Sequence, residues 1–133
     1  MLHSFTWFKV ADNSGVKLAK CIRVYKKGQT EFGSLGDLVS VVVKESITPH
    51  KRQKIKPGTI FKAIVIRQKS RLKRPTGQWR SYRDNAIVLF GTGPSYVKAN
   101  VYNPLSKRVY GPTCFELRAK GFSKVVSLSR RIT

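Results

Sequence analysis

The sequence predicts a mainly β fold: a small closed β-barrel with a projecting basic hairpin and short helices near the end of the chain. Short runs rich in β-branched residues, each bounded by turn residues, fill most of the first hundred positions. The pattern becomes helical only in the last quarter. The length of 133 residues suits one domain over 1–133, with the barrel at about 1–105 and a helical segment at about 109–129.

The expected barrel strands are separated by turns and polar loops. The segment 12–15 reads Asp-Asn-Ser-Gly, which favours a tight turn. The apolar run 63–66 is expected to line the barrel interior, whereas Lys62 and Lys44 should point outward. Five or six short strands of this kind are typical of a small closed barrel. The expected strands are 5–11, 18–25, 38–46, 59–68 and 85–90, and the expected loops are 26–37, 47–58 and 91–95.

Between the last two of these strands lies the most basic stretch of the chain, RQKSRLKRPTGQWRSYR at 67–83, with seven Lys or Arg and no acid. Its Pro-Thr-Gly centre predicts a hairpin with arms of about eight residues. Such cations neutralise phosphates, and aromatic rings stack on unpaired bases. A second basic cluster at 51–56 is expected beside it. The candidate RNA-binding residues are Lys51, Arg52, Lys54, Lys56, Arg67, Lys69, Arg71, Lys73, Arg74, Trp79, Arg80, Tyr82 and Arg83.

After the barrel, Pro112 suits a first helical position and Gly121 a helix stop, so a helix is expected over 112–120. Glu116 and Lys120 would form an i,i+4 pair in the favourable order. A turn or a second short helix is expected around 122–128.

The first of these helices can bury only one of two pairs of residues on a narrow stripe. These pairs are Phe115 with Ala119 and Cys114 with Leu117. The other pair would stay partly exposed and form an apolar patch. Two interpretations of the segment remain open: a docking surface for a partner with acidic edges, or a cap on the end of the barrel. The cations expected at the rim of the patch are Lys107, Arg108, Lys120 and Lys124.

The net charge indicates the class of partner. The chain has 27 Lys and Arg against 6 Asp and Glu, a formal net charge of +21. A compact domain with this charge repels itself unless a polyanion neutralises it, and nucleic acid is the first choice. An anionic membrane is the second choice. However, no apolar run approaches the roughly 20 residues of a spanning helix, and no long amphipathic basic helix is visible, so no membrane partner is expected.

Residues for catalysis or metal binding are scarce. His3 and His50 are the only histidines, and the six carboxylates are scattered without metal-ligand or acid/base spacing. Cys21 and Cys114 belong to no CxxC pair and are expected to be reduced structural cysteines. The Gly-rich segment 91–95 reads as a turn rather than a phosphate loop. We therefore expect no enzymatic activity, no metal and no cofactor.

Seven blocks of sequence stand in a specific order along nearly the whole chain. They are ADNSG (11–15), GSLGD (33–37), VVVKE (41–45), KPGTIFKAIVIR (56–67), RPTGQWRSY (74–82), DNAIVL (84–89) and VYGPTCFELR (109–118). In content, order and spacing they resemble the universal large-subunit ribosomal protein fourteen family. One such block alone would be a weak signal, but the ordered array is highly specific.

This resemblance implies a five-stranded β-barrel with a projecting β-ribbon and a pair of short C-terminal helices. It implies a structural constituent of the large ribosomal subunit that binds large-subunit rRNA and contacts neighbouring ribosomal proteins. It also implies a place at the subunit interface, with bridges to small-subunit rRNA, and a C-terminal surface to which the ribosome silencing factor docks. On this chain the partner surface would include Lys107, Arg108, Phe122 and Lys124. The alternative function is an extra-ribosomal β-barrel RNA-binding factor.

The chain departs from the family pattern at three places. Thr76 stands where the family usually has Asp or Asn before the turn glycine, the segment 102–108 is atypical, and the chain ends in the basic SLSRRIT. Mitochondrial relatives often end in a similar basic way, so a mitochondrial ribosome is expected, with a plastid or a bacterial cytoplasm as alternatives. No presequence is visible at the start. The chain is made where it works, has lost a presequence, or carries an internal signal.

Overall fold

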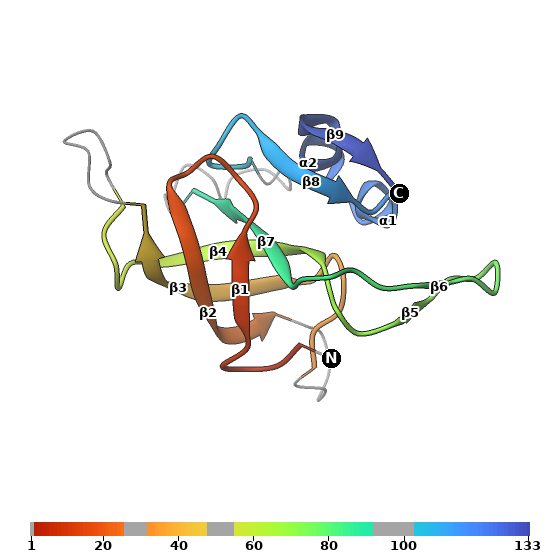
Figure 1. The fold of residues 1–133 in the computed structure, drawn as a ribbon, viewed down its shortest axis with the longest axis horizontal. Helices are drawn as coiled ribbons and strands as arrows, with labels where there is room; N and C mark the ends of the chain where they lie inside the picture. The colour runs from red at the N-terminus through yellow and green to blue at the C-terminus, as the bar shows by residue number, and fades with distance from the viewer. Residues whose placement is uncertain (1, 26–31, 48–54, 92–102) are drawn as a thin grey trace.

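A computed structural model gives the fold and describes residues 2–25, 32–47, 55–91 and 103–133. Five strands close into a barrel in the order β1-β2-β3-β4-β7 (Figure 1). Neighbouring strands are antiparallel except β1 and β7, which close the barrel in parallel. The predicted mainly β, five-stranded closed barrel is confirmed. The barrel strands are β1 (Trp7–Val10), β2 (Val16–Tyr25), β3 (Leu38–Ser46), β4 (Ile60–Arg67) and β7 (Ala86–Phe90).

The barrel interior is filled by alternate residues of the strands. Val39, Val41 and Val43 of β3 pack there with Ala63 and Val65 of β4, because successive side chains of a strand point to opposite faces. Lys62 and Lys44 are exposed, as predicted. Parts of the expected loops 26–37, 47–58 and 91–95 lie outside the described residues.

A second hydrophobic cluster lies on the outside of the barrel. Ile64 and Ile66 do not line the interior as predicted, because successive residues of β4 point to opposite faces. With Val88 they point away from the interior and are buried against Leu117 and Val125 from the end of the chain. This end forms a C-terminal unit, residues 109–133, that packs along one side of the barrel (Figure 1). Its elements are β8 (Val109–Thr113), α1 (Glu116–Ala119), α2 (Ser123–Leu128) and β9 (Ser129–Ile132).

The helix predicted over 112–120 is shorter than expected. Pro112 lies in β8, which pairs in parallel with β9, and α1 begins only at Glu116. Pairing of Pro112 and Thr113 with Arg131 and Ile132 holds the start of the predicted helix extended, and Gly111 just before it has a left-handed φ of +79°. Of the two candidate pairs, Cys114 with Leu117 is buried and Phe115 with Ala119 is exposed.

The basic hairpin (residues 67–83) extends away from the barrel (Figure 1). Its ladder is shorter than the predicted arms, because β5 (Leu72–Lys73) and β6 (Trp79–Arg80) pair over only two positions. At the tip the Arg74 N–H donates to the Gln78 carbonyl at 2.8 Å, and Gly77 takes a φ of +85°. Strands this short position the tip but do not by themselves hold the hairpin rigid.

Candidate nucleic-acid interface at the basic hairpin

The hairpin presents cations and one large aromatic ring to solvent. Lys69, Arg71, Lys73 and Arg83 are exposed, and the Trp79 side chain is 62% exposed at the tip. Arg80 and Tyr82 are half-buried. Exposed cations along a ribbon can neutralise phosphates of a nucleic-acid backbone, which is the chemistry predicted for this stretch.

Lys73 and Trp79 form a unit on the short ladder. They are cross-strand partners, and the Lys73 Nζ lies 5.9 Å from the centre of the Trp79 ring. A cation beside an exposed indole combines a phosphate contact with a flat face on which an unpaired base can stack.

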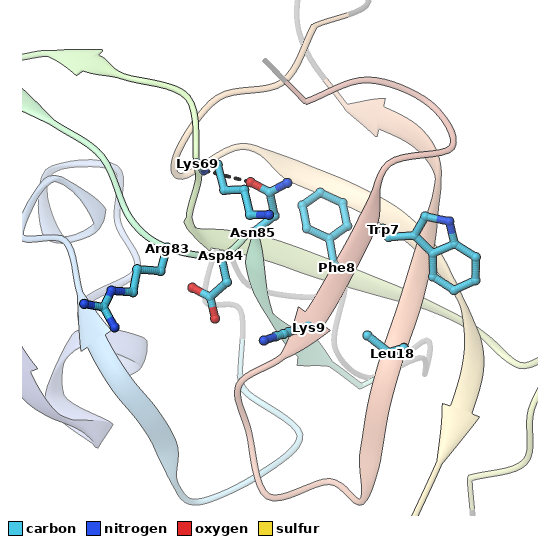
Figure 2. A pocket seen from close by; sticks show the side chains of 8 residues that line it. All are labelled: Trp7, Phe8, Lys9, Leu18, Lys69, Arg83, Asp84 and Asn85. Carbon is cyan, nitrogen blue, oxygen red and sulfur yellow. Dashed lines mark hydrogen bonds between the residues drawn. The ribbon is translucent and has the colours of Figure 1, made fainter.

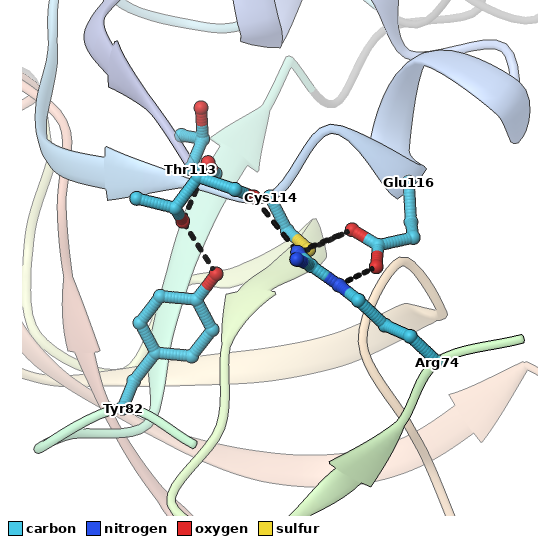
Figure 3. Close-up of polar contacts among 6 residues, drawn as sticks. Arg74, Tyr82, Thr113, Cys114 and Glu116 are labelled. Carbon is cyan, nitrogen blue, oxygen red and sulfur yellow. Dashed lines mark hydrogen bonds and ion pairs between the residues drawn. The ribbon is translucent and has the colours of Figure 1, made fainter. Parts of the chain in front are cut away.

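Arg74 differs from the other hairpin cations because its guanidinium is turned inward. It is 7% exposed, and its Nε donates to Glu116 Oε1 at 2.6 Å (Figure 3). Its Nη2 donates to the Thr133 carbonyl at 2.8 Å and to Cys114 Sγ at 3.4 Å. The Cys114 thiol in turn donates to Glu116. Arg74 therefore joins the hairpin to the C-terminal unit, and its burial argues against the predicted direct contact with RNA.

The titration of Glu116 reflects this network. Burial alone would raise the pKa of the Glu116 carboxyl, but hydrogen bonds from Cys114 and Arg74 outweigh it and lower the pKa below its ordinary value of 4.5. The same pairing raises the pKa of Arg74. Tyr82 adds a second link, because its hydroxyl lies 2.9 Å from Thr133 Oγ1. Burial raises the pKa of Tyr82, so this phenol stays protonated at neutral pH.

Arg67 also has an internal role. Its Nε donates to Asp84 Oδ1 at 3.0 Å, and its Nη1 donates to the carbonyls of Tyr110 and Pro112 at 2.9 and 3.1 Å. The guanidinium approaches β8 closely because Gly111 has no side chain there. Arg67 therefore ties the root of the hairpin to the C-terminal unit, which again argues against the predicted RNA contact.

Sequence reasoning placed both arginines among the RNA-binding cations because they lie in one acid-free run. Their partners Asp84 and Glu116 are two of only six acids in the chain, and Asp84 directly follows the hairpin. The position of these acids was the available signal that some arginines of the run are buried, since a buried arginine is normally paired with a carboxylate.

A cationic depression lies where the hairpin leaves the barrel. Figure 2 shows Lys9 of β1, Lys69 of the hairpin and Asp84 among its lining residues, and Trp7 of β1 lines it as well. The Lys69 N–H donates to Asn85 Oδ1 at 2.8 Å and fixes this corner. The cationic depression has a volume of about 220 Å³. A neighbouring depression of about 510 Å³ is also lined by Lys9 and Asp84. Lys9 was not among the predicted RNA-binding residues. The available signal was the alternation along β1, in which Phe8 is buried and the neighbouring Lys9 is therefore exposed.

The second predicted basic cluster is only partly visible. Lys51, Arg52 and Lys54 lie outside the described residues, while Lys56 is exposed before the predicted Pro-Gly turn. Gly58 has a φ of +90° in this turn, and its N–H donates to the Val43 carbonyl at 2.8 Å.

The predicted partner surface of the C-terminal segment is corrected at Phe122. Lys107, Arg108 and Lys124 are exposed, and the Lys124 ammonium donates to Asn103 Oδ1 at 2.6 Å. Phe122 is buried and stacks on Phe90 with ring centres 6.1 Å apart. It belongs to the core because the turn after Gly121 directs its ring toward the barrel.

Lys120 does not form the predicted pair with Glu116. Its ammonium donates to the Leu35 carbonyl at 2.8 Å and to Asp37 at 3.1 Å, so it ties α1 to the loop before β3. The apolar residues that the C-terminal unit does expose are Tyr110, Phe115 and Ile132.

The remaining titratable groups carry no arrangement typical of catalysis. Both cysteines are free and buried, and burial raises the pKa of the Cys21 thiol to about 11, which makes it unreactive at neutral pH. In the described segments no three His, Cys, Asp or Glu side chains gather as a metal site. None of the helices found there is long and apolar enough to cross a bilayer.

Fold and charge together define a small basic β-barrel protein with one exposed cationic hairpin. The family model for ribosomal protein L14p/L23e matches residues 1–133, and the chain therefore belongs to this family. Membership of this family gives it a structural role in the large ribosomal subunit and implies ribosomal RNA and other ribosomal proteins as partners. The family resemblance seen in the sequence is confirmed.

Proposed function

We propose that the basic hairpin is the main contact of this protein with large-subunit rRNA. The observation that carries the proposal is the exposure of Lys69, Arg71 and Lys73 along a ribbon that extends from the barrel and ends in the exposed Trp79. Lys9 and Arg83 extend the same surface to the root of the hairpin. Arg67 and Arg74 support it from within by fixing the hairpin to the C-terminal unit.

The test is the salt dependence of binding to a large-subunit rRNA transcript. Changing Lys69, Arg71 and Lys73 together to Ala should leave the barrel folded, because all three side chains are exposed. The slope of log K against log salt should become shallower by about 0.7 to 0.9 for each phosphate contact that is lost. Filter binding between low and moderate salt measures this slope.

The matched control changes Lys17, Lys44 and Lys62 to Ala. These cations are equally exposed but lie on the barrel, so the net charge falls by the same amount without touching the hairpin. If both triple variants flatten the slope equally, binding depends on diffuse charge and the hairpin is not its main site.

The C-terminal unit is proposed to face the subunit interface. Its exposed Tyr110, Phe115 and Ile132 supply apolar contact area. Lys124 of the unit, with Lys107 and Arg108 directly before the unit, supplies exposed charge. This combination suits both a bridge to small-subunit rRNA and an acidic-edged protein such as the ribosome silencing factor.

The basic end of the chain, SLSRRIT, supports a mitochondrial ribosome as the location. Immunodetection of the chain in gradient fractions of mitochondria and cytosol tests this assignment.

A further inference from the structure

The outer surface of the barrel has two unlike halves. On β4 and β7 the outward residues Ile64, Ile66 and Val88 are buried under the C-terminal unit. On β1, β2 and the beginning of β4 the outward residues are exposed, although several of them are just as apolar. At its edge, Trp7 and Lys9 line the cationic depression beside the hairpin, but the remainder of this half has no role in the contacts described above.

Four residues cross this second half as one row, here called the outer row. Trp7 is the cross-strand partner of Lys20, Lys20 of Val42, and Val42 of Ile60. Trp7 is 51% exposed and Ile60 is 56% exposed, while Val42 is half-buried. Ile22 of β2 is also exposed beside the row. Contiguous exposed apolar residues on a folded protein are a feature of interaction surfaces, whereas singly exposed ones are ordinary.

Lys20 lies among aromatic rings rather than beside a carboxylate. Its Nζ is 5.6 Å from the centre of the Trp7 ring and 5.2 Å from that of Phe5. None of the salt bridges found in the described residues involves it. The aromatic contacts hold the ammonium over the row, where a carboxylate from outside could reach it.

Phe5 adds a strained element at the edge of the row. It is the only described residue other than glycine with a positive φ, at 69°, and its ring is 71% exposed. Its N–H donates to the Cys21 carbonyl at 2.9 Å, and the Cys21 N–H donates to the Thr6 carbonyl at 2.9 Å. These bonds to β2 maintain a backbone conformation that presents an aromatic ring to solvent, a combination typical of binding sites.

We propose that the outer row is a docking surface for an apolar protein segment that carries an acidic side chain. The carboxylate pairs with Lys20, and flanking apolar residues pack on Trp7 and Ile60. The cation beside the Trp7 ring resembles the pair of Lys73 and Trp79 on the hairpin. The difference is that three aliphatic residues, Val42, Ile22 and Ile60, surround it and offer neither a flat ring for a base nor a charge for a phosphate. Apolar side chains of a protein complement this surface better than RNA does. The surrounding exposed charges are mostly Lys, which selects an acidic partner.

The experiment uses assembled large subunits in which the photo-reactive residue p-benzoylphenylalanine replaces Ile60. After irradiation, cross-linked peptides are identified by mass spectrometry. The expected product joins the photo-reactive residue at position 60 to a peptide of a neighbouring ribosomal protein. That peptide should have Asp or Glu within a few residues of the cross-link. In the same background Lys20→Glu should lower the cross-link yield roughly fivefold, since a charge pair becomes a repulsion.

Two variants control this result. Lys44→Glu makes the same charge change on an exposed side chain outside the row and should leave the yield unchanged. Lys20→Met keeps the apolar stem and removes the charge, so it reports the pairing even if Lys20→Glu fails to fold. It should lower the yield as well, though by less.

The inference rests on the proposed function, since it places the chain among neighbours in a large subunit. Absence of the chain from sedimented large subunits would contradict both. If the chain is present but Ile60 cross-links to rRNA or to nothing, or if neither Lys20 variant lowers the yield, the docking surface alone is overturned and the hairpin's role in rRNA binding stands.

Discussion

Arg74 shows how one side chain can connect the hairpin to the rest of the molecule. Its guanidinium donates to Glu116, Cys114 and the Thr133 carbonyl, all in the C-terminal unit. The planar group satisfies several acceptors at once, which a lysine in its place would not. The cation–π contact between Arg74 and Phe115, at 4.7 Å, extends the same link to the surface.

Removing the pair should destabilise the fold in a pH-dependent way. We expect Glu116→Gln to lower the free energy of unfolding at pH 7 by about 1.5 to 3 kcal/mol, the usual contribution of hydrogen bonds to a charged group. The pKa of Glu116 is lower in the folded protein than its ordinary value of 4.5. Its contribution is therefore complete above that value and is lost as the pH falls through the folded pKa. Urea unfolding from pH 7 to pH 3 measures it.

The wild type and Glu116→Gln should accordingly converge in stability as the solution becomes acidic. The other carboxyls titrate in both proteins, so their effects cancel in the difference. A difference that stays constant, or grows, below pH 4.5 would mean that Arg74 does not stabilise the ionised form of Glu116.

Charge patterns in the sequence located the hairpin but did not predict which of its cations are exposed and which are buried. Lys69, Arg71 and Lys73 are exposed as expected, while Arg67 and Arg74 from the same run are buried. Both groups lie in the same acid-free run. What separates them is pairing with Asp84 and Glu116. The sequence places Asp84 directly after the hairpin, but that Glu116 meets Arg74 depends on tertiary structure and not on a local pattern.

Among the elements, the C-terminal unit departed most from expectation. The barrel strands were predictable because β-branched runs and turn residues agree with each other from β2 to β7. The parallel pair of β8 and β9 was not, since Gly111 and Pro112 are poor strand formers and β9 reads Ser-Arg-Arg-Ile. These strands form because the C-terminal unit packs on the barrel, a contact with no local signal.

Gly111 is the residue of β8 that makes this packing possible. A Cβ at Gly111 would lie 2.6 Å from Arg67 Nη1, and the φ of +79° already disfavours any other residue. Gly111→Ala should therefore displace the Arg67 guanidinium in addition to straining the backbone. We expect a loss of about 2 to 4 kcal/mol in the free energy of unfolding, measured by urea denaturation.

Gly121→Ala is the control for the backbone component. Gly121 has a similar φ of +91°, but a Cβ there would meet no atom within 4 Å. Its cost should be only about 1 to 2 kcal/mol, the usual penalty of the left-handed conformation. Equal losses for the two variants would show that contact between Gly111 and Arg67 contributes nothing.

The whole molecule combines three surfaces on one barrel. The hairpin extends from it, the C-terminal unit covers the outward side of β4 and β7, and the outer row occupies β1 to β4. The barrel fixes their relative positions, so a ribosomal protein of this size can meet RNA and protein on different sides at once. A formal net charge of +21 supplies attraction to rRNA, but charge alone does not assign a partner to each surface.

The C-terminal unit, with the basic residues directly before it, offers the test of this division. Reversing the charges of Arg108 and Lys124 to Glu changes two exposed side chains, so the protein should still fold and enter the large subunit. If these residues face the subunit interface, joining to small subunits or binding of the silencing factor should weaken, by roughly tenfold for a loss of about 1.4 kcal/mol. Quantitative mass spectrometry of isolated large subunits measures incorporation, and sedimentation at fixed Mg²⁺ measures joining.

Lys17→Glu with Lys44→Glu is the matched control, because it reverses the same amount of charge at exposed positions on the barrel. This control should join small subunits as the wild type does, since neither lysine lies in the C-terminal unit. The two assays separate the possible roles of Arg108 and Lys124. A variant that is present in large subunits at wild-type level but joins poorly places these residues at the interface. A variant that is depleted from large subunits instead shows that they bind large-subunit rRNA during assembly, because a surface used only after assembly cannot affect incorporation.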